Sequence, residues 1–378
     1  MTTAPTNSAG AEFRTITIVS LGLIGGSLAL AFKRSGFAGK LIGVSREETL
    51  QSAKRQKIID EGFAYGNLCE AASQADLVIL AGPIHVVRQH LQELGNQPDK
   101  LRPGTLITDV GSTKQAILED AERFLPSSVH FIGGHPMAGS EKSGLDAADA
   151  FLFQNAYYAL TPAKGVPPDL VDGFVDFLSR TGARLVILDA KTHDRTAAAI
   201  SHLPQLIAVA LVNYLDELGD NRELGVRLAA GGFRDMTRIA SSRFDMWKDI
   251  FATNSTAARD ALANFIQHLS SSSDRIGTDS MREDFDRAAE TRAAIPSDSK
   301  GFLHPLREIL VVVEDKPGVI AEISNVLAED SINILDIEVL KVREGEGGTL
   351  RLAFASLPVA EQAIELLTKK GYAVRMRQ

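Results

Sequence analysis

The fold is decided by one stretch near the start of the chain, Ile16-Thr17-Ile18-Val19-Ser20-Leu21-Gly22-Leu23-Ile24-Gly25-Gly26-Ser27. Its first four residues are apolar or β-branched, as in a buried strand, and a helical run from Leu28 to Arg34 follows. A strand, a glycine turn and a helix in this order are the context in which such a motif indicates dinucleotide binding. We expect Gly22 to let the backbone approach a pyrophosphate and Gly25 to let the helix pack closely on the strand.

The turn departs from the G-x-G-x-x-G pattern because Ser20 occupies the place of the first glycine. A serine there is strained if the turn requires a positive φ. The turn, which contains Leu23 and Ile24, still leads to a helix N-terminus that offers free N–H groups and a favourable dipole to phosphates. A glycine-rich turn in an unrelated α/β protein is the alternative, and the flanking strand and helix argue against it.

A second expected strand, Leu41 to Val44, ends in Ser45-Arg46. In dinucleotide-binding folds the residue about twenty positions after the glycine turn reads the adenosine ribose, and an acid there selects NAD. A hydroxyl and a guanidinium suit the 2′-phosphate of NADP instead. Glu47 and Glu48 lie close by and weaken this inference, so we expect NADP to be preferred, with NAD as the alternative.

Apolar strands and helical runs alternate as far as residue 190. Strands are expected at 76–83, 105–112, 156–160 and 184–188, and helices at 86–94, 114–124 and 169–180. This rhythm predicts a parallel, doubly wound sheet, and we assign residues 14–190 to a Rossmann-type α/β domain. The carboxyl ends of its strands would bring Pro83 and Ser112 to the same edge as Gly22. Ser112 would then contact a substrate, cap the helix that begins at Lys114, or do both.

The same edge receives Phe131-Ile132-Gly133-Gly134-His135-Pro136-Met137-Ala138-Gly139-Ser140-Glu141. Residues 129–132 read as the last buried strand of the parallel sheet, and a proline restricts the residue before it to extended geometry. His135 would therefore present an imidazole where open α/β sheets bind ligands, and histidine can accept a proton near neutral pH. A loop histidine that only bonds to local backbone is the alternative interpretation.

Beyond Asp189 the strand signal ends, and residues 191–291 predict an all-helical domain. Helical spacing runs from 191 to 218 and recurs at 223–230, 244–251 and 257–269. His202, in Ser201-His202-Leu203-Pro204, can face a cavity at a proline bend, although such a histidine is more often structural. Arg238 follows Asp235 by three residues on one helix face, so the pair can present a rigid guanidinium to a carboxylate or form a surface ion pair.

Taken together, five motifs resemble the prephenate dehydrogenase family, which includes arogenate and cyclohexadienyl dehydrogenases. They are Leu21-Gly22-Leu23-Ile24-Gly25-Gly26-Ser27, Asp109-Val110-Gly111-Ser112-Thr113-Lys114, Gly134-His135-Pro136-Met137-Ala138-Gly139-Ser140-Glu141, Ser201-His202-Leu203-Pro204 and Phe233-Arg234-Asp235-Met236-Thr237-Arg238. The resemblance implies NAD(P)-dependent oxidative decarboxylation of prephenate to 4-hydroxyphenylpyruvate in tyrosine biosynthesis. It implies that His135 accepts the hydroxyl proton and that Ser112 helps to place the hydroxyl, the histidine and the nicotinamide.

By the same resemblance, Arg238 grips the ring carboxylate, His202 lies near the pyruvyl side chain, and Ser140 and Glu141 match a gating segment at the mouth of the cleft. The sequence does not separate prephenate from arogenate. Two other classes of protein stay possible. One is another hydroxy-acid dehydrogenase, for which the helical domain offers no persuasive catalytic lysine, and the other is a nucleotide-binding regulator without catalysis.

The last part of the chain, residues 306–378, follows a linker-like run from Ala294 to Gly301. Strands are expected at 307–313, 332–341, 349–355 and 373–376, with helices at 319–327 and 359–370, which gives the order βαββαβ. With the turn Asp315-Lys316-Pro317-Gly318, this order resembles an ACT domain. The resemblance implies pairing between chains and binding of an amino acid, here tyrosine as a feedback inhibitor. A dimerisation module without a ligand is the alternative.

The composition of the chain further limits the functions and cellular locations that are expected. The chain of 378 residues carries a net charge of −8, which argues against general nucleic-acid binding. Its single cysteine, Cys69, fits a reducing compartment. Residues 1–14 lack the features of a signal peptide, and glycines interrupt the most apolar run, residues 16–32. We therefore expect a cytoplasmic protein that uses no metal and binds no membrane, and the long helix after the nucleotide domain suggests a homodimer by analogy.

Overall fold

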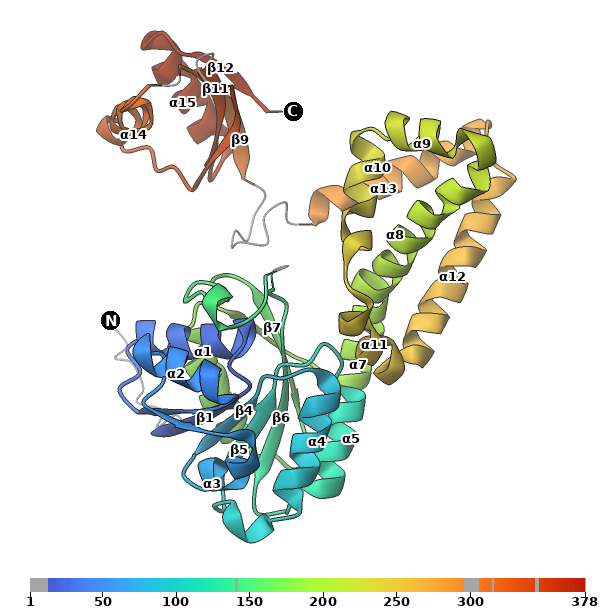
Figure 1. Cartoon of the computed structure of the whole chain (residues 1–378). Helices are drawn as coiled ribbons and strands as arrows, with labels where there is room; N and C mark the ends of the chain where they lie inside the picture. Colours follow the sequence, from blue (N-terminus) through green and yellow to red (C-terminus); the bar gives the residue numbers. More distant parts are fainter. Residues whose placement is uncertain (1–12, 140–141, 296–305, 315, 344–346, 378) are drawn as a thin grey trace, which may run out of the picture. The chain divides into compact units, whose positions relative to one another are not determined.

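The computed structural model describes residues 13–139, 142–295, 306–314, 316–343 and 347–377. It divides into two compact units, which join in the sequence between Thr278 and Asp279 and are described separately. The first unit holds a large sheet followed by a helical region, and the second holds a smaller sheet (Figure 1).

An eight-stranded sheet in the order β3-β2-β1-β4-β5-β6-β7-β8 forms the centre of the first unit (Figure 1). The strands are β1 Thr15–Val19, β2 Lys40–Val44, β3 Glu61–Phe63, β4 Leu77–Leu80, β5 Leu106–Asp109, β6 His130–Pro136, β7 Tyr157–Pro162 and β8 Arg184–Ile187. β1 to β6 are parallel and follow the order of dinucleotide-binding folds, which confirms the Rossmann-type domain.

The sheet continues beyond β6 in the reversed direction, because β7 is antiparallel to β6 and β8 is parallel to β7. A parallel neighbour requires a long crossover, usually a helix. The described residues between β6 and β7 contain only the short 3-10 turn Leu145–Ala147, so the chain returns directly. β6 is therefore the last strand of the parallel series formed by β1 to β6, and β7 covers its outer edge.

Helices cover both faces of this sheet. They are α1 Leu23–Arg34, α2 Glu47–Arg55, α3 Leu68–Ala72, α4 Ile84–Gly95, α5 Gln115–Phe124 and α6 Pro168–Ser179. Successive strand residues point to opposite faces, so Ile16 and Ile18 of β1 pack with α1 and α6, whereas Val19 packs with α3, α4 and α5. Burial on both faces explains the continuous apolar strands of the sequence.

The helical region continues the first unit and confirms the predicted all-helical middle. Its elements are α7 Ala190–Ala197, η4 Ala198–His202, α8 Leu203–Asn213, η5 Tyr214–Asn221, α9 Arg222–Leu228, α10 Gly231–Thr237, η6 Arg238–Ser241, α11 Phe244–Thr253 and α12 Ser255–Ser273. At the expected bend the chain forms a π-helix, η4, which ends at His202, two residues before Pro204. Proline lacks an N–H and crowds the carbonyl four residues earlier, so the turn widens at this point.

One stretch of the described residues, Ala190–Leu228, is long and apolar enough to cross a membrane by length and composition alone. A single stretch of this kind is weak evidence, because helices inside soluble proteins pass the same test. The stretch also carries the buried ionisable side chains of His193, Asp194 and His202, which are costly in a bilayer. We therefore read it as part of the helical domain.

The second unit begins with the 3-10 turn η7, Asp279–Met281, and α13, Arg282–Ala294, and it confirms the βαββαβ order predicted for an ACT domain. It continues with β9 Arg307–Val313, α14 Val319–Glu329, β10 Asp336–Arg343, β11 Gly347–Phe354, α15 Leu357–Lys369 and β12 Ala373–Met376. The four strands form an antiparallel sheet in the order β10-β11-β9-β12. Ile323 of α14 and Leu367 of α15 join its apolar core with Ile309 and Leu352 of the sheet.

Candidate active site

The glycine turn between β1 and α1 is shaped to hold a phosphate. Ser20 has a φ of +72°, so the serine in place of glycine is held in the strained left-handed region. A Cβ on Gly25 would lie 2.4 Å from the carbonyl oxygen of Ser20, so only glycine lets α1 pack this closely. A Cβ on Gly22 would meet nothing within 4 Å, and α1 starts at Leu23 without a side-chain cap. The first N–H groups of α1, including that of Ile24, therefore suit a pyrophosphate.

Ser45, Arg46 and Pro83 lie at the same edge of the sheet as this turn. Ser45 directly follows β2 and is buried, whereas Arg46 is exposed and precedes the first turn of α2. Pro83 is exposed and precedes α4. The sheet topology thus brings together the residues expected to contact the cofactor. The residue directly after β2 is Ser45, so the acid that would select NAD is absent from this position.

A buried ion pair fixes the end of β6 beside this edge. The ammonium of Lys114 contacts the carboxylate of Asp109, and both side chains are fully buried. Lys114 Nζ also donates to the carbonyl oxygen of Gly134 at 2.6 Å, and Asp109 Oδ1 accepts the N–H of Gly134 at 3.1 Å. Both backbone groups of the residue before His135 are therefore held by one charged pair.

His135 belongs to β6 and pairs with Ala159 of β7, so it is not a loop histidine. Its Nδ1 lies 2.8 Å from Nε2 of His193, which comes from α7. Burial of the ring lowers the pKa of His135 well below its usual range, and repulsion from His193, Lys114 and His202 adds to this effect. A neutral, half-buried imidazole at this edge of the sheet is suited to accept a proton.

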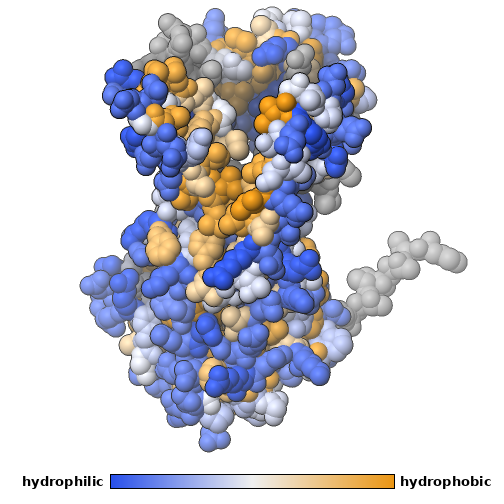
Figure 2. Space-filling view, turned by 90° about the vertical axis from the view of Figure 1, so that its right-hand side faces the viewer, coloured by the Kyte–Doolittle hydropathy of each residue, from blue (hydrophilic) through white to orange (hydrophobic). Residues whose placement is uncertain are grey.

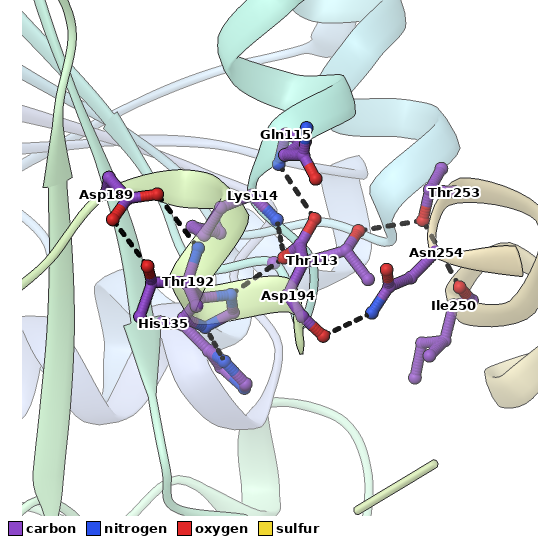
Figure 3. Close-up of polar contacts among 12 residues, drawn as sticks. Thr113, Lys114, Gln115, His135, Asp189, Thr192, Asp194, Ile250, Thr253 and Asn254 are labelled. Carbon is purple, nitrogen blue, oxygen red and sulfur yellow. Dashed lines mark hydrogen bonds and ion pairs between the residues drawn. The ribbon is translucent and has the colours of Figure 1, made fainter. Parts of the chain in front are cut away.

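Asp194 joins α7 to the start of α5 (Figure 3). Its carboxylate accepts the backbone N–H groups of Lys114 at 2.7 Å and Gln115 at 3.0 Å, and it lies 2.8 Å from Nδ1 of His193. A carboxylate from another element therefore caps α5 and complements its dipole. The alternative that Ser112 caps this helix is wrong, because Lys114 is the N-cap residue and Ser112 lies half-buried two residues earlier.

Asn254, between α11 and α12, connects this network to His202. Its Nδ2 donates to the backbone carbonyl of Asp194 at 2.8 Å and lies 3.3 Å from Nδ1 of His202. His202 lies in η4, is buried, and stands edge-on to Trp247. Burial lowers the pKa of His202 to about 4, so its imidazole is neutral near pH 7. Hydrogen bonds thus link the histidine of the sheet to the histidine of the helical region.

Arg238 is the first residue of η6, which α8 holds in place. Gln205 Nε2 donates to the carbonyl oxygen of Ile239 at 3.1 Å, and Gln205 lies three residues after His202. The segment that carries Arg238 is therefore fixed to the helix that follows His202. Arg238 itself is exposed.

Asp235 and Arg238 span the junction of two helices instead of sharing one helix face. Asp235 belongs to α10, which starts at Gly231 and ends at Thr237. Arg238 then starts a 3-10 helix. Ser140 and Glu141, the expected gating residues, lie outside the described residues.

Sequence reasoning did not place His193, Asp194 and Asn254 in this site. The available signal for the first two was an adjacent His-Asp pair in the first turns of a helix whose N-cap is Asp189. Asn254 gives no such signal, because only the packing of the helices brings it to the backbone of Asp194.

Three family models match the chain. They describe a prephenate dehydrogenase nucleotide-binding domain at residues 28–187, a prephenate dehydrogenase dimerization domain at 189–290 and an ACT domain at 307–371. The prephenate dehydrogenase of Bacillus subtilis is 38% identical in an alignment that covers 93% of this chain and 95% of the relative.

Two solved structures resemble the chain in fold and sequence. The prephenate dehydrogenase of Aquifex aeolicus, in complex with hydroxyphenyl propionate and NAD+, is 30% identical with a TM-score of 0.67, over 75% of this chain and 99% of that one. The arogenate dehydrogenase of Synechocystis is 32% identical with a TM-score of 0.65, over 74% of this chain and 98% of that one.

Proposed function

The chain belongs to the prephenate dehydrogenase family, and we propose that it catalyses the NAD(P)-dependent oxidative decarboxylation of prephenate to 4-hydroxyphenylpyruvate. The observation that carries this proposal is the neutral imidazole of His135 at the carboxyl edge of a dinucleotide-binding sheet. Bound nicotinamide supplies the acceptor for the hydride of the ring carbon that bears the hydroxyl group. His135 takes the proton of that hydroxyl, and the ring carboxylate leaves as CO2 while the ring becomes aromatic.

Three further side chains bind and orient the substrate in this proposal. Ser112, half-buried beyond β5, places the hydroxyl group between His135 and the nicotinamide. Arg238 binds the ring carboxylate, because a guanidinium matches a carboxylate with two parallel hydrogen bonds. His202, neutral and buried, faces the pyruvyl side chain. Arg238→Gln should therefore raise the KM for the substrate more than it lowers kcat.

We infer that the cofactor is NAD(P), with NADP preferred. The open space at Gly22 and the uncapped start of α1 fit the pyrophosphate of either cofactor. Ser45 and Arg46 stand where an acid would select NAD. Loss of a charge-assisted hydrogen bond costs about 1.5–3 kcal/mol, so Arg46→Ala should raise the KM for NADP about tenfold or more and leave that for NAD unchanged. Arg55→Ala, at the other end of α2, is the matched control and should change neither.

A rate measurement with two substrates and two cofactors tests the function. Prephenate should drive reduction of NADP and, more weakly, of NAD, with one CO2 released per turnover. Arogenate is the second candidate substrate, because a solved arogenate dehydrogenase is 32% identical to this chain. Absence of reduction with either substrate would contradict the proposal, and reduction without CO2 would favour a simple hydroxy-acid dehydrogenase.

The helical region supports a homodimer. Its family model is named a dimerization domain, and many large apolar side chains of this region are exposed. Figure 2 shows apolar residues gathered along one face of it. The exposed large apolar side chains of this region include Val209, Val212, Leu224, Leu228, Ile266 and Leu269. An apolar surface of this kind is typical of an interface between subunits. Light scattering should give twice the chain mass of 40.7 kDa, and a monomer would contradict the proposal.

Tyrosine is the proposed effector of the ACT domain. A cavity of about 560 Å³ in this domain is lined by Val313, Glu314, Lys316, Gly318 and Ile320, among others. α14 starts after Gly318 without a side-chain cap, so its free N–H groups suit an amino-acid carboxylate. The carboxylate of Glu314 is suited to an ammonium group, and the apolar walls to a ring.

We place the protein in the cytoplasm. Cys69 is buried and free, which fits a reducing compartment. Cell fractionation with the tagged full chain checks the location, and recovery in the membrane fraction would contradict it.

A further inference from the structure

We propose that His193 is a positioning residue that fixes His135 as the tautomer able to accept a proton at Nε2. The inference rests on the proposed function, in which His135 is the base. The position of His193 explains why Nε2 of His135, the nitrogen that accepts the proton, carries a lone pair. A neutral imidazole has one donor and one acceptor nitrogen, and the hydrogen bond at one nitrogen decides the state of the other.

Asp194 determines which nitrogen of His193 carries a hydrogen, and its side chain is buried with 1% exposed. Backbone N–H groups can only donate, so the bonds from Lys114 to Oδ1 and from Gln115 to Oδ2 make both carboxylate oxygens acceptors. The positive end of the α5 dipole favours the ionised carboxylate at the same place. Nδ1 of His193 lies 2.8 Å from Oδ1, and it must therefore be the donor in that bond.

The next bond transfers this constraint to His135. With its hydrogen on Nδ1, a neutral His193 offers only a lone pair at Nε2, 2.8 Å from Nδ1 of His135. Nδ1 of His135 therefore donates, and its Nε2 carries no hydrogen. His193 is 4% exposed, and its Nε2 faces Nδ1 of His135, which carries no negative charge.

The orientation of the ring is fixed from the other side by the strand. The Asp109–Lys114 pair holds both backbone groups of Gly134, and Pro136 follows His135 within β6. The ring of His135 consequently has little freedom to turn away from His193. When Nε2 takes the hydroxyl proton, the O–H bond breaks and the N–H bond forms. The positive charge on His135 is then shared with His193 through their hydrogen bond, with Asp194 behind it.

Two substitutions at one position separate positioning from packing. His193→Phe keeps the ring volume but cannot accept the bond from His135, whereas His193→Gln offers an amide oxygen at a similar reach. General-base catalysis contributes about 10²–10⁴-fold, so His193→Phe should lower kcat at least about tenfold with little change in KM. His193→Gln should recover most of the rate. His130→Phe, at the far end of the same strand, is the control and should behave as the wild type.

The pH profile supplies a readout that a merely structural role would not change. The charged and titratable groups that act on His135 are His193, Lys114 and His202, with Asp109 and Asp194 beyond them. In the proposed tautomer His193 is neutral and accepts the hydrogen bond from Nδ1 of His135, which stabilises the protonated ring. His193→Phe removes this acceptor, so its acid limb of kcat should move to lower pH. An equal loss of kcat in His193→Phe and His193→Gln would overturn the inference. So would a rise in KM together with a loss of stability.

A measurement without substrate keeps this test separate from the proposed function. In the unliganded full chain labelled with ring-¹⁵N histidine, the resonances of His135 are identified by their absence in His135→Asn. The inference predicts a protonated Nδ1 and an unprotonated Nε2 in the wild type, and a shift toward protonated Nε2 in His193→Phe. A wild type with protonated Nε2 overturns the inference even if prephenate is oxidised. The predicted shifts in a protein without dehydrogenase activity would sustain it while the proposed function fails.

Discussion

At the scale of single residues, the site depends on how His135 is kept neutral and aimed. A histidine in water is partly protonated near pH 6.5. Here the half-buried ring is partly shielded from water and faces His193, Lys114 and His202, so its pKa falls well below that value. The nearby carboxylates do not reverse this effect, because Asp109 is paired with Lys114 and Asp194 caps α5.

This lowered pKa predicts the acid side of the rate profile. The neutral form of His135 is the active base, so kcat should stay near its plateau at pH 6.5, where an ordinary histidine would be half protonated, and fall only at lower pH. The measurement is kcat with saturating substrate and cofactor at constant ionic strength. Loss of half the rate at or above pH 6.5 would show that the base is not held neutral.

The free energy of unfolding should fall at acid pH, as kcat does, which gives an independent check on His135 and His202. The pKa of His135 is lowered, and that of His202 is lowered to about 4, so below pH 6.5 the unfolded chain binds more protons than the folded one. The free energy of unfolding should therefore decrease as the pH falls from about 6.5 toward 4. Thermal unfolding over this range shows whether a drop in rate precedes unfolding.

The residue types of the site could be predicted from the sequence, but not their connections. His135 was found because a proline follows it and a strand precedes it, and Ser112 because it ends a strand. Lys114 was read only as the start of a helix, whereas it is buried and holds Gly134. A buried lysine cannot be recognised from its neighbours in sequence, because its partner Asp109 becomes close only when the strand end and the helix start fold together.

At the scale of elements, the contact between β1 and α1 decides whether a cofactor site exists. The helix comes so close that Gly25 faces the carbonyl oxygen of Ser20, while Gly22 faces open space. Two glycines of one turn therefore have different tasks. One permits packing, and the other leaves room for the ligand.

Alanine substitutions should separate these tasks. Gly25→Ala introduces a Cβ 2.4 Å from a backbone oxygen, and such overpacking costs about 1–3 kcal/mol, so the free energy of unfolding in urea should drop by that amount. Gly22→Ala is the matched control, because its φ of −98° suits alanine and no atom lies within 4 Å. It should keep or slightly raise stability and yet weaken NADP binding. Equal stability of both variants would contradict this assignment.

The elements themselves follow largely from the sequence, and the exceptions have local causes. Apolar runs gave the parallel strands because both faces of the sheet are buried. The reversal at β7 is not encoded in β7 itself, since it depends on the missing crossover helix after β6. The π-helix before Pro204 and the helix that begins at Gly231 both depart from ordinary residue preferences, which only the packing of the helical region can overcome.

At the scale of the whole molecule, two separate units carry two tasks. The first holds the cofactor edge and the histidines, and the second holds the cavity proposed for tyrosine. Inhibition by tyrosine therefore requires coupling between distinct sites. Tyrosine can inhibit only to the extent that its affinity differs between the active and inactive states.

Filling the cavity should remove regulation without removing catalysis. Ile320 lines it and is 45% exposed, so Ile320→Trp should abolish inhibition by tyrosine and leave basal turnover unchanged. Val312→Trp is the matched control, because Val312 is also exposed in this unit and does not line the cavity. Rates of prephenate oxidation with and without tyrosine provide the measurement. Unchanged inhibition in Ile320→Trp would place the effector elsewhere.

The central claim is that one imidazole at the end of β6 accepts the hydroxyl proton while hydride leaves for nicotinamide. The most direct test is the turnover of His135→Asn with prephenate and saturating NADP at neutral pH. The account predicts that kcat falls about 10²–10⁴-fold while the cofactor still binds with nearly the wild-type affinity. A variant that turns over within about threefold of the wild type, a loss far smaller than the predicted one, would contradict it.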